Sequence, residues 1–126
     1  MKRLDRKPTD AELGILRALW ARGPSTVRDV AAAMGREASY TTILKLLQIM
    51  TDKQLVRRDE SSRTHIYEAT YSEEQVQQHL VADLLDRAFD GSAAKLLMRA
   101  LAVKKASPKE LVEIAKLLKG HRGGGQ

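Results

Sequence analysis

The stretch that most constrains the fold is residues 38–52, which read ASYTTILKLLQIMTD. Its large apolar side chains recur every three or four residues, which predicts one packed face of a helix. These side chains are Ile43, Leu46, Leu47 and Met50. The first turn carries short hydroxyls instead, and Lys45 follows one turn later. Because a helix in the DNA major groove presents its N-terminal residues to bases and phosphates, we interpret this segment as a recognition helix.

Length, charge and residue usage exclude several classes of protein. The chain has 126 residues, enough for one ordinary domain or two small ones, and a formal net charge of +6. It has no cysteine, which excludes disulfides, thiol catalysis and thiolate metal sites. The histidines are isolated in the sequence, so we expect no metal site, cofactor or catalytic group. Without a long apolar run or a secretory signal, we expect no membrane insertion and a cytoplasmic location.

Two helices are predicted before the recognition helix. Thr9 and Glu12 match a capping box that opens the first helix, and Gly23 with Pro24 ends it. Ser25 is the predicted cap of a second, short helix that runs to about residue 34. Three short helices in succession are typical of a helix-turn-helix protein.

A hairpin is predicted after the recognition helix. Residues 55–58 and 65–69 alternate in character as two short strands, and the polar segment 59–64 separates them as a turn. Three helices followed by a hairpin is the element order of a winged helix. We therefore predict a mainly α fold with a small β-hairpin, in which residues 1–71 form a winged-helix DNA-binding domain.

The predicted DNA contacts are polar or basic residues of the second helix, the recognition helix and the hairpin. Hydroxyls and long cations reach base edges or phosphates, and neutralising phosphates makes DNA affinity fall with salt. Tyr40 has two interpretations, because it can bond a phosphate or pack on the hairpin. The predicted contacts are Ser25, Thr26, Arg28, Ser39, Tyr40, Thr41, Thr42, Lys45, Arg57, Arg58, Arg63 and His65.

The chain is predicted to be helical again from residue 72, with three helices that end at Gly120. Their wide apolar faces either fold back on the first domain or join two copies of the chain. We favour self-association and predict a dimerisation domain over residues 72–120, followed by a flexible tail, 121–126. The predicted dimerisation residues are Leu80, Leu84, Leu85, Phe89, Leu97, Leu101, Leu111, Ile114 and Leu118.

Several segments resemble the penicillinase-repressor family, the BlaI/MecI type of bacterial winged-helix repressor. The similar segments are Tyr40-Thr41-Thr42-Ile43, Lys53-Gln54-Leu55-Val56, Tyr67, and Ser25 to Val30, within a resemblance that covers roughly residues 4–119. The resemblance implies a homodimer that binds an inverted-repeat operator in double-stranded DNA and represses transcription. It also implies a further partner, a regulatory protease or membrane sensor, with cleavage of the dimerisation region releasing the DNA.

Two other functions compete with a dimeric repressor. A winged-helix protein-interaction module without specific DNA binding is favoured only by Leu44, an apolar residue on the predicted recognition helix. The arginines of the hairpin and Lys45 favour DNA instead. An enzyme is disfavoured because the sequence has no glycine-rich phosphate loop, metal-ligand spacing or nucleophile with a base. The sequence indicates no ligand pocket, so we expect regulation to act on the dimer interface.

Overall fold

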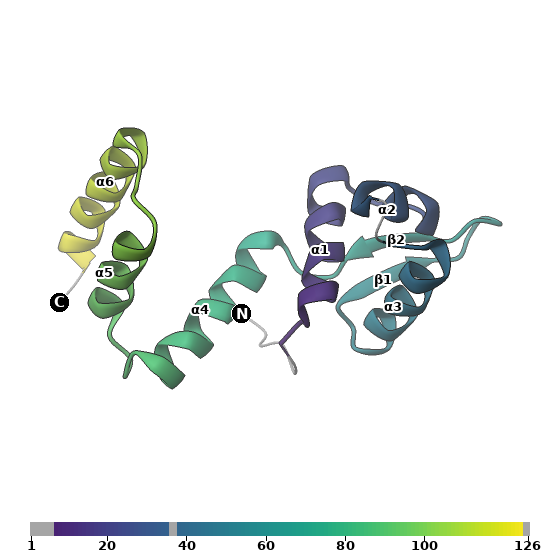
Figure 1. The fold of residues 1–126 in the computed structure, drawn as a ribbon, viewed down its shortest axis with the longest axis horizontal. Coiled ribbons are helices and arrows are strands. Elements are labelled where there is room, and N and C mark those ends of the chain that lie inside the picture. The colour runs from purple at the N-terminus through teal and green to yellow at the C-terminus, as the bar shows by residue number, and fades with distance from the viewer. Residues whose placement is uncertain (1–6, 36–37, 125–126) are drawn as a thin grey trace. The chain divides into compact units, whose positions relative to one another are not determined.

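The structure of the chain is a computed structural model that describes residues 7–35 and 38–124. The described residues form six helices and one two-stranded antiparallel sheet (Figure 1). The predicted mainly α fold with a small hairpin is therefore confirmed. The chain divides into two compact units, Met1–Ala82 and Asp83–Gln126, and each is described by itself.

Three helices begin the first unit: α1 (Asp10–Arg22), α2 (Val27–Met34) and α3 (Tyr40–Asp52). The capping box predicted for α1 is present. The backbone N–H of Glu12 donates to the Thr9 hydroxyl at 3.2 Å, and the Thr9 N–H donates to the Glu12 carboxylate at 2.9 Å. These bonds satisfy donors that a helix N-terminus otherwise leaves unpaired, and so they fix where α1 begins.

The cap of α2 differs from the prediction by one residue. Thr26, and not Ser25, accepts the backbone N–H of Asp29, and the Asp29 carboxylate accepts the Thr26 N–H in return. These bonds hold the pKa of Asp29 below its usual value. Ser25 is drawn into the sheet instead, because its N–H donates to the Tyr67 carbonyl at 2.9 Å and its carbonyl accepts the Tyr67 N–H at 2.7 Å.

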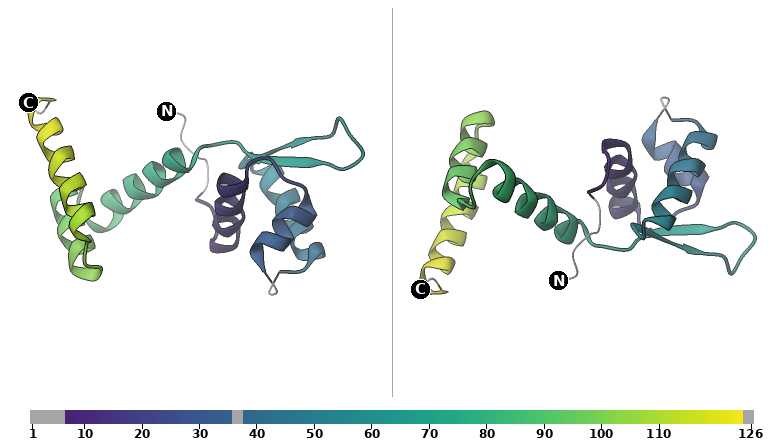
Figure 2. Two further views of the ribbon diagram at one scale, coloured as in Figure 1. Left: turned by 90° about the horizontal axis from the view of Figure 1, so that it is seen from above. Right: turned by 90° about the horizontal axis from the view of Figure 1, so that it is seen from below.

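The predicted hairpin consists of β1 (Val56–Asp59) and β2 (Ile66–Ala69), with Val56 opposite Ala69 and Asp59 opposite Ile66. We call these strands and the turn between them the wing. Figure 2 shows the wing extending beyond the three helices of its unit. The backbone pairing of Ser25 with Tyr67 ties the base of the wing to the start of α2.

One hydrophobic core holds the first unit together. Its side chains come from all three helices, from both strands of the wing and the residue before β1, and from α4 (Glu73–Ala88). Val76 of α4 is buried in this core and Leu80 packs against it. The first unit therefore extends to Ala82, whereas the sequence placed a boundary between residues 71 and 72. The buried core residues are Ile15, Leu16, Leu19, Val27, Val30, Ile43, Leu47, Met50, Leu55, Val56, Tyr67 and Val76.

The second unit contains the end of α4 together with α5 (Ala93–Val103) and α6 (Pro108–Gly124). Ser92 caps α5 as a hydroxyl acceptor for the Lys95 N–H, and Ser107 caps α6 in the same way for Glu110. The predicted end of the last helix at Gly120 is wrong, because α6 continues to Gly124. The predicted flexible tail therefore begins within a helix, and its last two residues, 125–126, lie outside the described residues. In the described ranges, no helix combines the length and apolar character needed to cross a membrane.

Candidate nucleic-acid interface

The side of α3 that faces away from the core carries the hydroxyls and the lysine of the predicted recognition helix. Ile43, Leu47 and Met50 are buried, and this anchors α3 on the core. Ser39, Tyr40, Thr41, Thr42 and Lys45 are all exposed. The apolar spacing therefore sets one face of α3 inward and leaves the opposite polar face available to a ligand.

The first turn of α3 has a fixed arrangement of hydroxyls. The Ser39 hydroxyl accepts the backbone N–H of Thr42 at 3.1 Å and donates its own proton to the Thr42 hydroxyl oxygen at 2.9 Å. This pairing leaves the Thr42 proton free to donate outward. Ser39 thus acts first as a helix cap and holds the orientation of the neighbouring hydroxyl.

The predicted contacts at the start of α2 and just before it comprise one buried residue and two accessible ones. Ser25 is only 2% exposed, and its hydroxyl donates to the Gly23 carbonyl at 2.8 Å. The structure therefore assigns Ser25 to the scaffold and does not support its predicted contact with DNA. Thr26 is partly exposed at the start of α2, and Arg28 is exposed on the first turn.

Two of the three wing arginines have carboxylate partners. Arg57 lies across the strands from Glu68 with a nitrogen–oxygen distance of 3.4 Å, and Arg58 contacts Glu60 at 2.7 Å. The pKa of Arg58 is raised by the Tyr67 hydroxyl and by Glu60. Because adjacent strand residues point to opposite faces, these two arginines do not lie on one surface of the wing.

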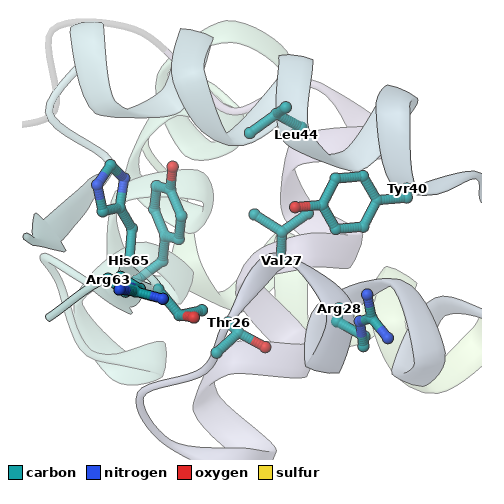
Figure 3. A pocket seen from close by; sticks show the side chains of 9 residues that line it. Thr26, Val27, Arg28, Tyr40, Leu44, Arg63 and His65 are labelled. Carbon is teal, nitrogen blue, oxygen red and sulfur yellow. The ribbon is translucent and has the colours of Figure 1, made fainter.

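Arg63 and His65 of the wing lie on the same side as the starts of α2 and α3. Together with Thr26, Arg28 and Tyr40 they line a cleft of about 530 Å³, which we call the wing cleft (Figure 3). The remaining lining residues are Val27, Leu44, Thr64 and Tyr67. The wing cleft brings together five predicted contacts that are up to 39 positions apart in sequence, from Thr26 to His65.

An ion pair that the sequence did not reveal supports the far end of α3. Lys53, the residue that caps α3, donates from Nζ to the Glu12 carboxylate of α1 at 2.8 Å. Burial acts to raise the pKa of Glu12, but hydrogen bonds from Lys53 and Thr9 outweigh it and leave that pKa below its usual value. The partners are 41 residues apart, so no local pattern indicates their contact.

The described residues contain no group of three or more histidine and carboxylate side chains that could hold a metal ion. The chemistry of this surface is that of hydroxyl donors and cations on an exposed helix beside an exposed hairpin. Such a surface is suited to base edges and phosphates. The fold and this surface define a winged-helix protein of the DNA-binding type.

The chain belongs to the penicillinase repressor family. It matches the family described as Penicillinase repressor over residues 8–120, and the family consists of transcriptional repressors and not enzymes. It is similar to the transcriptional regulator BlaI of two Mycobacterium tuberculosis strains, CDC 1551 / Oshkosh and H37Rv. The identity is 32% over 87 residues, which cover 67% of this chain and 63% of each relative. The match thus spans less than two thirds of those relatives.

A solved structure shares the fold. It is that of BpsR from Bordetella bronchiseptica, a protein whose DNA binding is regulated by 6-hydroxynicotinic acid. The TM-score is 0.51 and the identity is 20%, over 94% of this chain and 82% of that one. At this identity the likeness shows the winged-helix fold alone. The chain is accordingly a winged-helix transcriptional regulator by fold and family.

Proposed function

We propose that the chain is a repressor that binds an inverted-repeat DNA operator as a homodimer. The observation that carries this proposal is the exposed N-terminal end of α3, with Thr41, Thr42 and Lys45 on the face opposite the buried core residues. Family membership supports the same function. A winged-helix protein-interaction module without specific DNA binding is the alternative, and the experiments below separate the two.

In the proposed complex, the first half of α3 lies in the major groove. Thr42 donates its free hydroxyl proton to a base acceptor or a phosphate, and Lys45 reaches a guanine or a phosphate. Arg28, Arg63 and Thr26 lie beside α3 and contact the DNA backbone. Arg57 and Arg58 contribute less, because a phosphate must first displace Glu68 or Glu60 from each.

The proposal of a homodimer is supported by the apolar surface of the second unit. No described residue between 83 and 121 is buried, although this segment is rich in leucine. Leu111, Leu117 and Leu118 of α6 are 49%, 62% and 56% exposed. A folded chain rarely leaves so many large apolar side chains exposed, and a second copy offers the same surface in return. Two linked recognition helices then match two half-sites of an operator.

We further propose that proteolysis in the second unit relieves repression. Residues 104–107 connect α5 to α6 without helical structure, and Val103 beside them is 87% exposed. A second candidate cleavage segment, residues 98–101, lies inside α5, where a protease must first unwind the helix. Cutting the 104–107 connection separates α6 from the rest of the chain and so removes part of the proposed dimer interface.

The first experiment is fluorescence anisotropy with a duplex from the upstream region of the chain's own gene and a shuffled duplex, at two salt concentrations. We expect selective binding to the native duplex at two chains per site, weakening steeply as salt rises. Equal and weak binding to both duplexes would contradict the repressor and favour the interaction module.

Two substitutions that each remove one positive charge test whether α3 contacts the DNA. Lys45→Gln removes the lysine of the recognition helix and is expected to weaken operator binding by about 1–3 kcal/mol if it contacts a base. Arg17→Gln, on the exposed side of α1, is the control and should change binding little. An equal loss in both variants would mean that only net charge matters.

The proteolysis proposal is tested by cleavage mapping. The chain is incubated with a purified candidate protease under inducing conditions, and fragments are identified by mass spectrometry. A cut within residues 104–107 that lowers operator affinity supports the proposal. A chain that stays intact under those conditions, or one cut without loss of operator binding, contradicts it.

A further inference from the structure

The wing cleft has features that contact with a DNA backbone does not require. Its floor includes Val27 and Tyr67, which are only 7% and 1% exposed, and Leu44 of α3 also lines it. Part of the cleft lining is thus apolar among polar and charged side chains, and a sugar–phosphate backbone gains little from apolar surface, because its own outer surface is charged. The volume of about 530 Å³ lies within the range of small-molecule sites, which is roughly 300–1,000 Å³.

Aromatic side chains are concentrated at this cleft. Two of the three tyrosines of the chain, Tyr40 and Tyr67, line it, together with the imidazole of His65. Figure 3 shows Tyr40 and His65 on opposite sides, with Val27 between them and Leu44 on the α3 side. A flat apolar ring placed there would have aromatic groups on both sides.

The charged groups of the cleft indicate that its ligand is an anion. Arg28 and Arg63 line it, and none of the nine lining residues is acidic. Among the described residues, neither arginine forms an ion pair, in contrast to Arg57 and Arg58. A guanidinium without a carboxylate partner is suited to bind the carboxylate of a ligand with two parallel hydrogen bonds.

We propose that the wing cleft binds a small aromatic carboxylate, with the ring over Val27 and Leu44 and the carboxylate at Arg63. Such a ligand occupies side chains that the proposed DNA complex also uses. Bound ligand and bound operator therefore exclude each other, a consequence that rests on the proposed function. This proposal departs from the expectation, drawn from the sequence, that the chain has no ligand pocket.

The test is a titration of the ¹⁵N-labelled full chain with benzoate at constant ionic strength, followed by amide chemical shifts. We expect saturable shifts at Val27, Leu44 and His65, with a Kd on the order of 1 mM for a molecule of this size. Benzamide, which lacks the charge, and inorganic phosphate, which lacks the ring, should each bind more weakly. Shifts that never saturate, or phosphate binding as tight as benzoate, would overturn the proposal.

Two arginines of the wing provide a matched pair of variants. Arg63→Gln removes the guanidinium proposed to bind the carboxylate and should weaken benzoate binding about tenfold or more, because its charge-assisted hydrogen bonds are lost. Arg57→Gln makes the same change outside the cleft and should leave benzoate binding within about twofold. Equal effects of the two variants would refute a specific site. Leu44→Gln tests the apolar floor independently, with circular dichroism to verify folding.

A competition experiment separates this proposal from the proposed function. Benzoate should release the native duplex from the chain, while benzamide should not. If benzoate saturates the cleft but the chain never binds its upstream duplex selectively, the ligand site stands and the repressor proposal falls. If the duplex binds selectively and benzoate neither saturates nor competes, the ligand site is refuted and the repressor proposal stands.

Discussion

The two units of the chain use similar sequences in different ways. The first has a core of side chains from α1, α2, α3, the wing and α4, and several of them have no exposed surface. The second has comparable leucine spacing along α5 and α6, yet none of its described residues to 121 is buried. Apolar periodicity thus shows that a helix has a face to cover, and it does not show what covers it. The apolar faces of the first unit pack against one another. We propose that those of the second unit pack against a second copy of the chain.

The largest effect is expected from a charge placed on the exposed face of α6. Leu118→Glu should convert the proposed dimer to monomers, because a carboxylate cannot be buried in an apolar interface without a partner. Operator affinity should then fall by about 10²–10⁴, the usual gain from linking two binding modules. Sedimentation and anisotropy measure the two effects.

The neighbouring substitution Lys119→Glu introduces the same side chain at an exposed polar position and serves as the control. It should leave the mass in solution unchanged. If Leu118→Glu also remains a dimer, α6 is not the interface, and the contrast between the two units needs another explanation.

A leucine-to-alanine substitution should destabilise the first unit when it creates a cavity in the core of that unit. The same substitution in the second unit should not. Leu47 has no exposed surface, so Leu47→Ala should lower the free energy of unfolding of the first unit by about 2–5 kcal/mol. Leu118→Ala, at a position 56% exposed, should leave that unit's unfolding unchanged. Urea titration followed by Trp20 fluorescence compares them. If both substitutions destabilised the first unit equally, the proposed contrast between the two units would be wrong.

The Glu12–Lys53 ion pair should make the first unit sensitive to acid. Because the folded pKa of Glu12 lies below its usual value of 4.5, its stabilising effect is present above that value and is lost as pH falls through the folded pKa. Glu12→Gln should therefore cost about 1–3 kcal/mol at pH 7. The difference from the unsubstituted chain should shrink as the pH falls below 4.5. A constant difference at every pH would show that the carboxylate charge is irrelevant.

The smallest effect is a gain of stability at one backbone position. Gln54 follows α3 with a φ of 65°, in the left-handed region that glycine adopts without strain. Gln54→Gly should stabilise the first unit by about 0.5–1 kcal/mol. Gln48→Gly, inside α3, should destabilise it by about 1 kcal/mol. Thermal unfolding distinguishes a gain from a loss, and a loss at both positions would contradict the argument.

Local patterns in the sequence predicted most of the elements. Thr9 with Glu12 is a short-range cap, and it begins the helix that the pattern indicated. Which residue caps α2, Ser25 or Thr26, could not be decided from neighbouring residues, because Ser25 is held by Tyr67, a residue of the wing. The end of α6 was also misplaced, since glycine weakens a helix without requiring it to stop.

The proposed contact surface was predictable in type but not in detail. Exposure of Thr41, Thr42 and Lys45 follows from helical spacing, and the structure agrees. The ion pairs of Arg57 and Arg58, the burial of Ser25 and the wing cleft depend on strand register and on contacts distant in sequence. No single-sequence pattern contains that information. The roles of these residues in DNA binding and dimerisation stay predictions.

The backbone pairing of Ser25 with Tyr67 has a consequence for how a regulator of this kind changes its target. Because main-chain atoms make both hydrogen bonds, the wing stays attached to α2 whatever side chains the exposed positions carry. Residues at the proposed DNA surface can then be replaced one at a time without detaching the hairpin. Such a scaffold allows specificity to change while the fold stays the same. Duplicated copies can then acquire new operators while keeping one architecture.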